Sequence, residues 1–224
     1  GATFVSTPEM TTCLERNPQR RHDAAARNEN DPAIRTASEL ARTHKIWLHL
    51  GSAAFASEGL KIFNRGLVFS PEGAITARYD KIHLFDVDLG AEKYRESDYI
   101  EWGDKAVIAD LGGPKLGLSI CYDVRFAALY RRLAQAGAEI LAVPAAFTRP
   151  TGEAHWEVLL RARAIENLCY VLAPAQQGRH VKDRLTWGHA MVVDPWGLVT
   201  ARCSEGEGVA VAELDLELVA RVRK

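Results

Sequence analysis

Apolar residues along the chain form two kinds of pattern, short continuous runs and runs with helical spacing. Apolar runs, typical of buried strands, lie at residues 46–53, 139–143 and 169–173, and residues 1–8 also predict a strand. Apolar residues recur at helical spacing from position 34 to position 41, just after Asn30, Asp31 and Pro32. A capping residue followed by proline is a helix-start signature. Residues 126–136, which Gly137 ends, and residues 156–167 also predict helices.

Turn residues join the remaining apolar segments into predicted hairpins, which pair residues 61–69 with 74–79, 106–111 with 115–120, and 187–194 with 198–201. The strand at 115–120, the helix at 126–136 and the strand at 139–143 favour a parallel strand–helix–strand unit. Residues 86–104 are polar and irregular, and we expect a long surface loop there. The pattern therefore predicts one mixed-sheet α/β domain over residues 1–224. The chain opens on a strand and stops inside a helix-like pattern, so we expect truncation at both ends.

Composition excludes several classes of partner. The 224 residues carry 28 Lys and Arg against 29 Asp and Glu, a net charge of −1, which gives no electrostatic reason to expect nucleic acid or an anionic membrane. No apolar run approaches the about 18 residues of a membrane span, and from the opening strand we expect no signal peptide. The four cysteines have no Cys-x-x-Cys spacing, which favours a reduced, cytoplasmic setting. The seven histidines lack metal-ligand spacing, and we expect no metal or other cofactor.

Cys121 is the residue whose placement most strongly indicates chemistry. It ends the apolar run at 115–120 and precedes the predicted helix at 126–136. A strand that turns into a helix lifts a side chain out of the sheet and aims free backbone N–H groups at it. The positive end of the helix dipole favours the thiolate, so we expect an easily ionised thiol. The alternative from the residues alone is a buried core cysteine, since free cysteine is among the most buried residue types.

Three other side chains are candidates for proton transfer or charge stabilisation. Glu9 follows the opening strand and Pro8, a position from which a carboxylate could take a proton from a thiol. Lys81 follows the strand at 74–79, and Glu96 lies in the predicted loop. Taken singly, each is explained more simply as an ordinary surface residue.

The sequence motifs around these residues occur together in one known family. Thr7-Pro-Glu9, Tyr79-Asp-Lys81-Ile-His83-Leu, Glu96-Ser97 and Leu118-Ser-Ile-Cys121-Tyr-Asp-Val-Arg125-Phe126 occur in this order. With these four motifs, the chain resembles the nitrilase superfamily of carbon–nitrogen hydrolases over essentially its whole length. The resemblance implies a four-layer αββα sandwich. It also implies a homodimer or larger homo-oligomer.

The resemblance further implies a Glu-Lys-Cys constellation. Glu9 would be the general base, Cys121 the nucleophile and Lys81 the cation that stabilises a tetrahedral oxyanion. The backbone N–H of Tyr122 would be the second oxyanion donor, and Glu96 a supporting carboxylate. Such a set is chemically coherent, because amide hydrolysis needs a nucleophile, donors aimed at the developing O⁻ and an acid for the leaving nitrogen.

Further stretches are similar to the branch of deaminated glutathione amidases and ω-amidases. They are Leu133-Ala-Gln-Ala-Gly137-Ala-Glu-Ile-Leu141, His155-Trp-Glu-Val-Leu-Leu-Arg-Ala-Arg-Ala-Ile-Glu166, Gly178-Arg-His180, Gly188-His189-Ala-Met-Val-Val-Asp-Pro-Trp-Gly197 and Ala201-Arg-Cys-Ser-Glu205-Gly. Both substrates of that branch end in carboxylates, and the planar fork of Arg125 suits a carboxylate. The alternative for Arg125 is a structural salt bridge. Phe147 and Thr151, in the predicted loop after the strand at 139–143, are further candidates for the substrate pocket.

We therefore expect an amidase that acts on a small carboxylate-bearing amide and releases ammonia through a thioester. One alternative is a hydrolase of another aliphatic amide or of a carbamoyl-amino acid. A catalytically silent fragment or binding module with the same fold is another, because the first strand and helix usual in the family are absent before Gly1. A Cys–His protease is disfavoured, since nothing places His155 or His189 beside Cys121.

Overall fold

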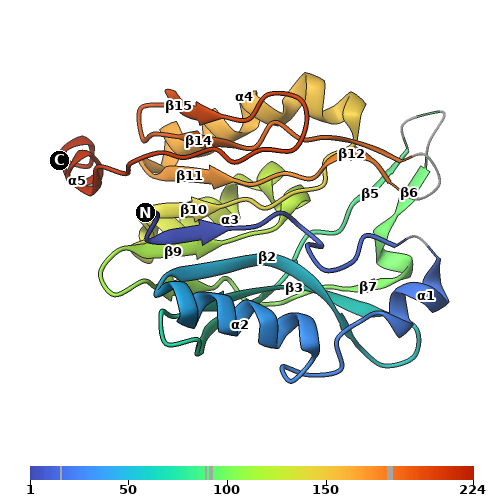
Figure 1. Cartoon of the computed structure of the whole chain (residues 1–224). Helices are drawn as coiled ribbons and strands as arrows, with labels where there is room; N and C mark the ends of the chain where they lie inside the picture. The colour runs from blue at the N-terminus through green and yellow to red at the C-terminus, as the bar shows by residue number, and fades with distance from the viewer. Residues whose placement is uncertain (16, 89, 91–92, 181–183) are drawn as a thin grey trace.

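The computed structural model describes all residues except 16, 89, 91–92 and 181–183. Within the described part, two sheets lie face to face (Figure 1). The first sheet has the order β1-β2-β3-β4, and β7 pairs with β3. Its strands are β1 (Phe4–Ser6), β2 (Trp47–Ala56), β3 (Ile62–Phe69), β4 (Ile75–Asp80) and β7 (Ile100–Glu101). β1 runs parallel to β2, while β2, β3 and β4 are antiparallel neighbours, so the predicted hairpin at 61–79 is confirmed.

The second sheet has the order β15-β14-β11-β10-β9-β8. Its strands are β8 (Ile108–Asp110), β9 (Lys115–Leu118), β10 (Ile140–Ala142), β11 (Tyr170–Ala173), β14 (Met191–Val193) and β15 (Val199–Arg202). β9, β10 and β11 are parallel, and the pairs β8–β9 and β14–β15 are antiparallel. The predicted strand–helix–strand unit and both remaining hairpins are therefore present, although the last has shifted bounds.

Helices cover the outer face of each sheet, which completes the four layers that the family resemblance implies (Figure 1). α1 (Pro18–Asp23) and α2 (Pro32–His44) pack on the first sheet, and α3 (Ala127–Gln135) and α4 (Arg149–Asn167) pack on the second. The helix-like pattern near the C-terminus is α5 (Leu216–Val222). The predicted start of α2 is confirmed, because the Asp31 side chain accepts a hydrogen bond from the Ala33 N–H at the N-cap.

The hydrophobic core joins the two sheets. Val68 and Tyr79, from the first sheet, pack in one buried cluster with Leu116 and Leu118 from β9. A separate cluster fills the space between α2 and the outer face of β2 and β3, and it includes Ile34 and Phe69. The loops at one end of the two packed sheets are therefore held in fixed relation, which is what a site built from several strand ends requires.

Two predicted elements differ from the structure near the second sheet. α4 begins at Arg149, seven residues before its predicted start, and its first turns contain Pro150 and Gly152. Gly152 is needed there because a Cβ atom would lie 2.2 Å from the Cβ of Trp187. The predicted strand at 187–194 is divided, because Gly188 and His189 both have positive φ and separate β13 (Leu185–Trp187) from β14. β13 pairs instead with β12 (Gln177–Arg179).

The segment at 86–104 is not the irregular surface loop that its polarity predicts. Its described residues form a hairpin of β5 (Asp86–Asp88) and β6 (Lys93–Arg95), the short 3-10 helix η1 (Glu96–Asp98) and β7; residues 89 and 91–92 lie outside the description. Both Glu96 and Ile100 are buried. A charged residue inside the protein requires a partner, and Glu96 finds it in the site described next.

Candidate active site

Glu9 lies in the tight turn that follows β1, against the inner part of β2. Gly51 makes this approach possible, because a Cβ atom at that position would lie 1.9 Å from the carbonyl oxygen of Thr7. The backbone N–H of Met10, a residue with φ of 52°, donates to Ser52 Oγ at 2.8 Å. The turn is thus pinned to β2, and it holds a carboxylate that is only 4 % exposed.

Three donors fix the two oxygens of this carboxylate. Asn64 Nδ2 and Lys81 Nζ donate to Glu9 Oε1 at 2.8 and 3.0 Å, and the backbone N–H of Ala146 donates to Oε2 at 2.8 Å. Asn64 is on β3, Lys81 follows β4 and Ala146 follows β10, so both sheets hold Glu9 in place. The side chain has one defined orientation, as a general base requires.

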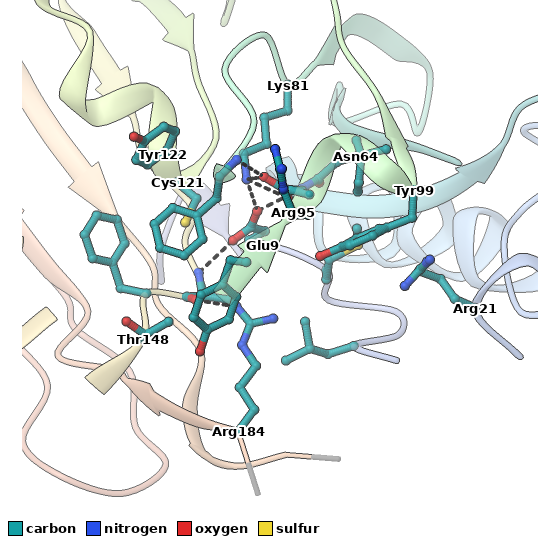
Figure 2. A pocket seen from close by; sticks show the side chains of 18 of the residues that line it. Glu9, Arg21, Asn64, Lys81, Arg95, Tyr99, Cys121, Tyr122, Thr148 and Arg184 are labelled. Carbon is teal, nitrogen blue, oxygen red and sulfur yellow. Dashed lines mark hydrogen bonds and ion pairs between the residues drawn. The ribbon is translucent and has the colours of Figure 1, made fainter. Parts of the chain in front are cut away.

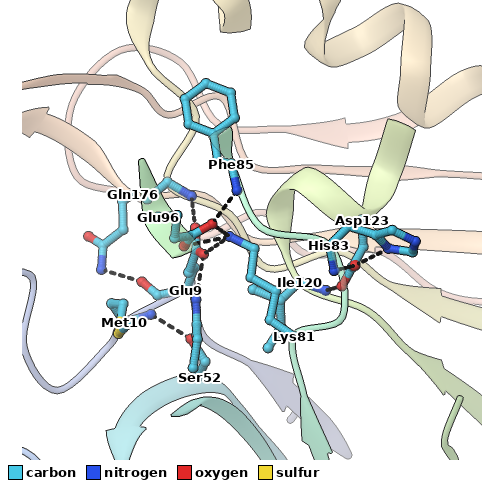
Figure 3. Close-up of polar contacts among 12 residues, drawn as sticks. Glu9, Met10, Ser52, Lys81, His83, Phe85, Glu96, Ile120, Asp123 and Gln176 are labelled. Atoms are coloured by element: carbon cyan, nitrogen blue, oxygen red, sulfur yellow. Dashed lines mark hydrogen bonds and ion pairs between the residues drawn. The ribbon is translucent and has the colours of Figure 1, made fainter. Parts of the chain in front are cut away.

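Lys81 is the centre of a cluster of buried charges, which we call the Lys81 cluster and which consists of Glu9, Lys81 and Glu96 (Figure 3). Besides its contact with Glu9, Lys81 Nζ donates to both carboxylate oxygens of Glu96 at 2.9 Å. The Lys81 side chain is 1 % exposed. The backbone N–H of Phe85 also donates to Glu96 Oε2, at 2.6 Å. Three residues that the sequence separates by up to 87 positions therefore form one hydrogen-bonded group.

Cys121 lies at a strained bend between β9 and the short 3-10 helix η2 (Cys121–Arg125). Its φ of 51° lies in the left-handed region, which costs an ordinary residue about 1–2 kcal/mol. Its backbone N–H donates to the carbonyl oxygen of Pro144 at 2.8 Å. This bend turns the side chain toward Glu9 and Lys81, as Figure 2 shows.

Electrostatics shift the pKa values of the two carboxylates in the Lys81 cluster in opposite directions. Burial alone would raise the pKa of Glu9, but the Lys81 charge and hydrogen bonds from Lys81 and Cys121 bring it below its usual value. Burial raises the pKa of Glu96, and the nearby Glu9 charge adds to this effect. Burial opposes the charge of Lys81, yet the two carboxylates hold its pKa well above the ordinary value. Glu9 is therefore the ionised carboxylate that is ready to accept a proton.

The expectation of an easily ionised thiol is wrong for this structure. Burial and the negative charge of Glu9 raise the pKa of Cys121 well above its usual value, despite the opposing effects of Lys81 and the Ala146 N–H. A 3-10 helix of five residues supplies too small a dipole to reverse these effects. The resting residue is a neutral thiol hydrogen-bonded to a carboxylate, which is the arrangement for general-base activation rather than for a preformed thiolate.

Asp123 is a structural member of the site that the sequence analysis did not single out. It is fully buried, and its Oδ2 accepts from the Tyr79 hydroxyl at 2.6 Å and from the Ile120 N–H at 2.8 Å. Its Oδ1 accepts from the backbone N–H of His83 at 2.9 Å and lies 2.7 Å from His83 Nδ1 (Figure 3). Asp123 thereby ties the bend at Cys121 to the segment that carries Lys81. Its place two residues after Cys121, inside a family motif, was the available signal.

The Lys81 cluster and Cys121 line one cavity, with a volume of about 160 Å³ (Figure 2). Tyr122, Phe147 and Thr151 also line it, although Thr151 belongs to the first turn of α4 and not to a loop. Arg125 is not among the described residues of the lining. Its Nη2 lies 3.2 Å from His155 Nδ1, and its guanidinium carbon lies 5.8 Å from the ring centroid of Phe147.

The described residues of the cavity include no histidine. His155 contacts Arg125, and His189 stacks on Trp187 with ring centroids 4.1 Å apart, so neither accompanies Cys121 as a Cys–His pair would require. In the part of the chain that the structure describes, no three or more His, Cys, Asp or Glu side chains gather as a metal site would need. Among the same residues, no helix combines the length and the apolar character that membrane crossing demands.

Comparisons with known proteins agree with this geometry. The model of the carbon–nitrogen hydrolase family matches residues 1–224. The chain is 46 % identical over 203 residues to a Yersinia enterocolitica protein named deaminated glutathione amidase, which covers 89 % of this chain and 71 % of that protein. It is 45 % identical over 236 residues to a Mus musculus protein of the same name, and this match covers 100 % of this chain and 71 % of that protein.

Solved structures show the same architecture. The crystal structure of the C. elegans NitFhit protein superposes with a TM-score of 0.92 at 42 % identity. The match covers 99 % of this chain and 54 % of that one, so the chain spans about half the length of NitFhit.

Proposed function

The chain belongs to the carbon–nitrogen hydrolase family, and on this premise we propose that it is a cysteine-dependent amidase for a small carboxylate-bearing amide of the deaminated glutathione type. Amide hydrolysis follows from the family and from relatives named as amidases. The single observation that carries the cysteine mechanism is the hydrogen-bonded convergence of Glu9, Lys81 and Cys121 in one cavity.

Acylation begins with the proton of the Cys121 thiol. Glu9 takes this proton while Sγ attacks the carbonyl carbon of the amide, so that charge leaves Glu9 and develops on the carbonyl oxygen. Lys81 Nζ and the backbone N–H of Tyr122 stabilise this oxyanion. Their attraction strengthens as the carbonyl becomes anionic, which lowers the barrier rather than only improving binding.

The tetrahedral intermediate then breaks its C–N bond. Glu9 donates the proton to the leaving nitrogen, and the acyl group stays on Cys121 as a thioester. In the second half, Glu9 takes a proton from water, the resulting oxygen attacks the thioester carbon and the thiolate leaves. Cys121 regains its proton from Glu9. Each cycle consumes one amide and one water, and it returns one carboxylic acid and one amine.

The chemistry of the substrate decides what leaves. A primary amide releases ammonia, as the sequence analysis expects, whereas the secondary amide of deaminated glutathione releases an amine. The two named relatives, at 45–46 % identity over most of this chain, support the secondary amide. An assay that detects only ammonia would therefore miss the proposed reaction.

The test is incubation with deaminated glutathione, with release of the primary amine followed by a fluorogenic amine reagent and by mass spectrometry. We expect turnover by the wild-type protein and none by Cys121→Ala, with an unchanged melting temperature. Cys203→Ala is the matched control, because Cys203 is buried elsewhere in the fold and does not line the cavity.

Three results would contradict the proposal. Activity retained by Cys121→Ala would exclude Cys121 as the nucleophile. Hydrolysis of a carbamoyl-amino acid but not of deaminated glutathione would assign another amide. A folded wild-type protein that hydrolyses neither would indicate a silent module with this fold.

A further inference from the structure

The cavity contains buried polar atoms that the protein itself leaves without a partner. Among the described residues, the side-chain atoms of this kind are Nε and Nη2 of Arg21, Oδ1 of Asn64 and Nε of Arg184. All three residues line the cavity that also holds Glu9 and Cys121. Buried donors and acceptors are normally satisfied, so their concentration on one cavity indicates a bound molecule that completes them.

Arg21 is the strongest of these groups. It belongs to α1, its residue is 4 % exposed, and its guanidinium carbon lies 3.9 Å from the centroid of the Tyr99 ring. Within the described residues, its Nη1 donates to the backbone carbonyl oxygen of Glu15 at 3.4 Å, and Nε and Nη2 have no hydrogen-bond partner. The stacked ring holds the guanidinium in a fixed plane, and its two unused nitrogens, Nε and Nη2, form the fork that a carboxylate accepts in bidentate fashion.

Arg184 adds a second guanidinium on the same cavity. Its Nη2 donates to the carbonyl oxygen of Ala146 at 2.8 Å. The N–H of the same Ala146 donates to Glu9. In Figure 2, Arg184 reaches toward Glu9 from one side of the cavity, and Arg21 lies beside Tyr99 on another. Arg184 also helps to lower the pKa of Glu9 through its charge.

The charge balance of the cavity points in the same direction. Its described lining has five cationic side chains against three carboxylates, namely Arg21, Lys81, Lys93, Arg95 and Arg184 against Glu9, Glu15 and Glu96. The Lys81 cluster accounts for two of the carboxylates and satisfies its own cation. Lys93 already pairs with Asp88 outside the lining, with Nζ 2.9 Å from Oδ2, so the cavity keeps a surplus of one positive charge, which favours an anionic substrate.

We propose that Arg21 binds a substrate carboxylate through Nε and Nη2, so that the enzyme selects amides with two carboxylates. This assignment rests on the proposed amidase function and names the substrate class of the same site. It gives Arg21 the role that the sequence analysis expected of Arg125, which contacts His155 and does not reach the described lining.

The experiment compares deaminated glutathione with two analogues, in each of which a methyl group replaces one of the carboxylates. For the wild-type protein we expect kcat/KM to fall about 10²-fold for at least one analogue, since a site with buried polar groups rejects a ligand that leaves them unpaired. Arg21→Gln should reduce this preference to within about threefold, mainly through KM. Arg20→Gln is the matched control, because Arg20 is an exposed neighbour on the same helix.

Arg21→Lys covers the case in which Arg21→Gln fails to fold. It keeps the positive charge and loses the planar fork, so we expect an intermediate preference. The proposal is overturned if either variant keeps the wild-type preference. It is also overturned if Arg21→Gln lowers kcat/KM equally for deaminated glutathione and the two analogues, since that result would make Arg21 a structural residue.

A binding measurement separates this proposal from the amidase function. Calorimetry on Cys121→Ala with the same three compounds gives dissociation constants without turnover. Selective binding that Arg21→Gln abolishes, together with no hydrolysis by the wild-type protein, would refute the amidase function and retain the carboxylate site. Hydrolysis of all three compounds without any preference for deaminated glutathione would retain the amidase function and refute the carboxylate site.

Discussion

The two buried cations of the cavity, Lys81 and Arg21, have opposite surroundings. Lys81 Nζ contacts three carboxylate oxygens within 3.0 Å, and its partners are held in turn by Asn64 and by backbone N–H groups. Arg21 is almost as deeply buried, yet its Nε and Nη2 have no hydrogen-bond partner in the part of the chain that the structure describes. In the proposed roles, Lys81 acts on the scissile bond and is preorganised by the protein itself, whereas Arg21 selects the substrate and is completed only by the ligand.

Lys81→Met removes the cation that is fully hydrogen-bonded within the protein, and we expect the largest effect from this substitution. The substitution leaves two carboxylates buried without their cation, which typically costs about 3–5 kcal/mol of unfolding free energy. Loss of one oxyanion donor should lower kcat by about 10²–10³-fold. Urea denaturation at pH 7 and steady-state kinetics measure the two effects, with the exposed Lys105→Met as control. A stable variant with normal kcat would contradict the proposed role of Lys81.

Asp123→Ala tests whether the geometry around Lys81 depends on Asp123, which ties the bend at Cys121 to the segment that carries Lys81. The Tyr79 hydroxyl and the N–H groups of Ile120 and His83 would lose their buried acceptor, at a cost of about 3 kcal/mol. Because Asp123 positions Cys121 relative to Lys81, we expect kcat to fall at least about tenfold while KM changes little. The exposed Asp104→Ala is the control. Equal kcat in the two variants would show that the bend at Cys121 needs no such support.

Arg21→Met removes the cation whose hydrogen bonds are incomplete, and we expect the smallest effect on stability from this substitution. An apolar side chain of similar length removes a buried charge whose Nε and Nη2 have no hydrogen-bond partner among the described residues, a change that is often neutral or stabilising. The lost stacking on Tyr99 offsets part of this gain. We expect the free energy of unfolding to change by less than about 1 kcal/mol, measured beside Lys81→Met under the same conditions. A loss as large as that of Lys81→Met would make the two cations equivalent.

The sequence predicted the architecture well wherever apolar periodicity reported on burial. The hairpin at 61–79, the parallel unit from 115 to 143 and the start of α2 are all present. The start of α4 was missed because Pro150 and Gly152 look like loop residues, and only the close approach of Trp187 explains the glycine. The segment at 86–104 was misread because its polarity comes partly from Glu96, a carboxylate buried against Lys81.

The site was predictable only in part, and for a physical reason. Glu9, Lys81, Glu96 and Cys121 stand in motifs that can be quoted from the chain, and the structure brings them to one cavity. The pKa of Cys121 was predicted with the wrong sign, since burial and the distance to Glu9 are properties of the folded molecule. Arg21 stood out in no motif, because its significance lies in the hydrogen bonds that it does not make.

The central claim is that Cys121 carries the acyl group during turnover. Rapid acid quenching of the protein with deaminated glutathione, followed by peptide mass spectrometry, tests it directly. We predict a 2-oxoglutaryl thioester on the peptide that contains Cys121, and no such adduct in Cys121→Ala. Amine release with the adduct on Cys13, Cys169 or Cys203, or with no adduct on any cysteine under conditions that preserve thioesters, would contradict the account.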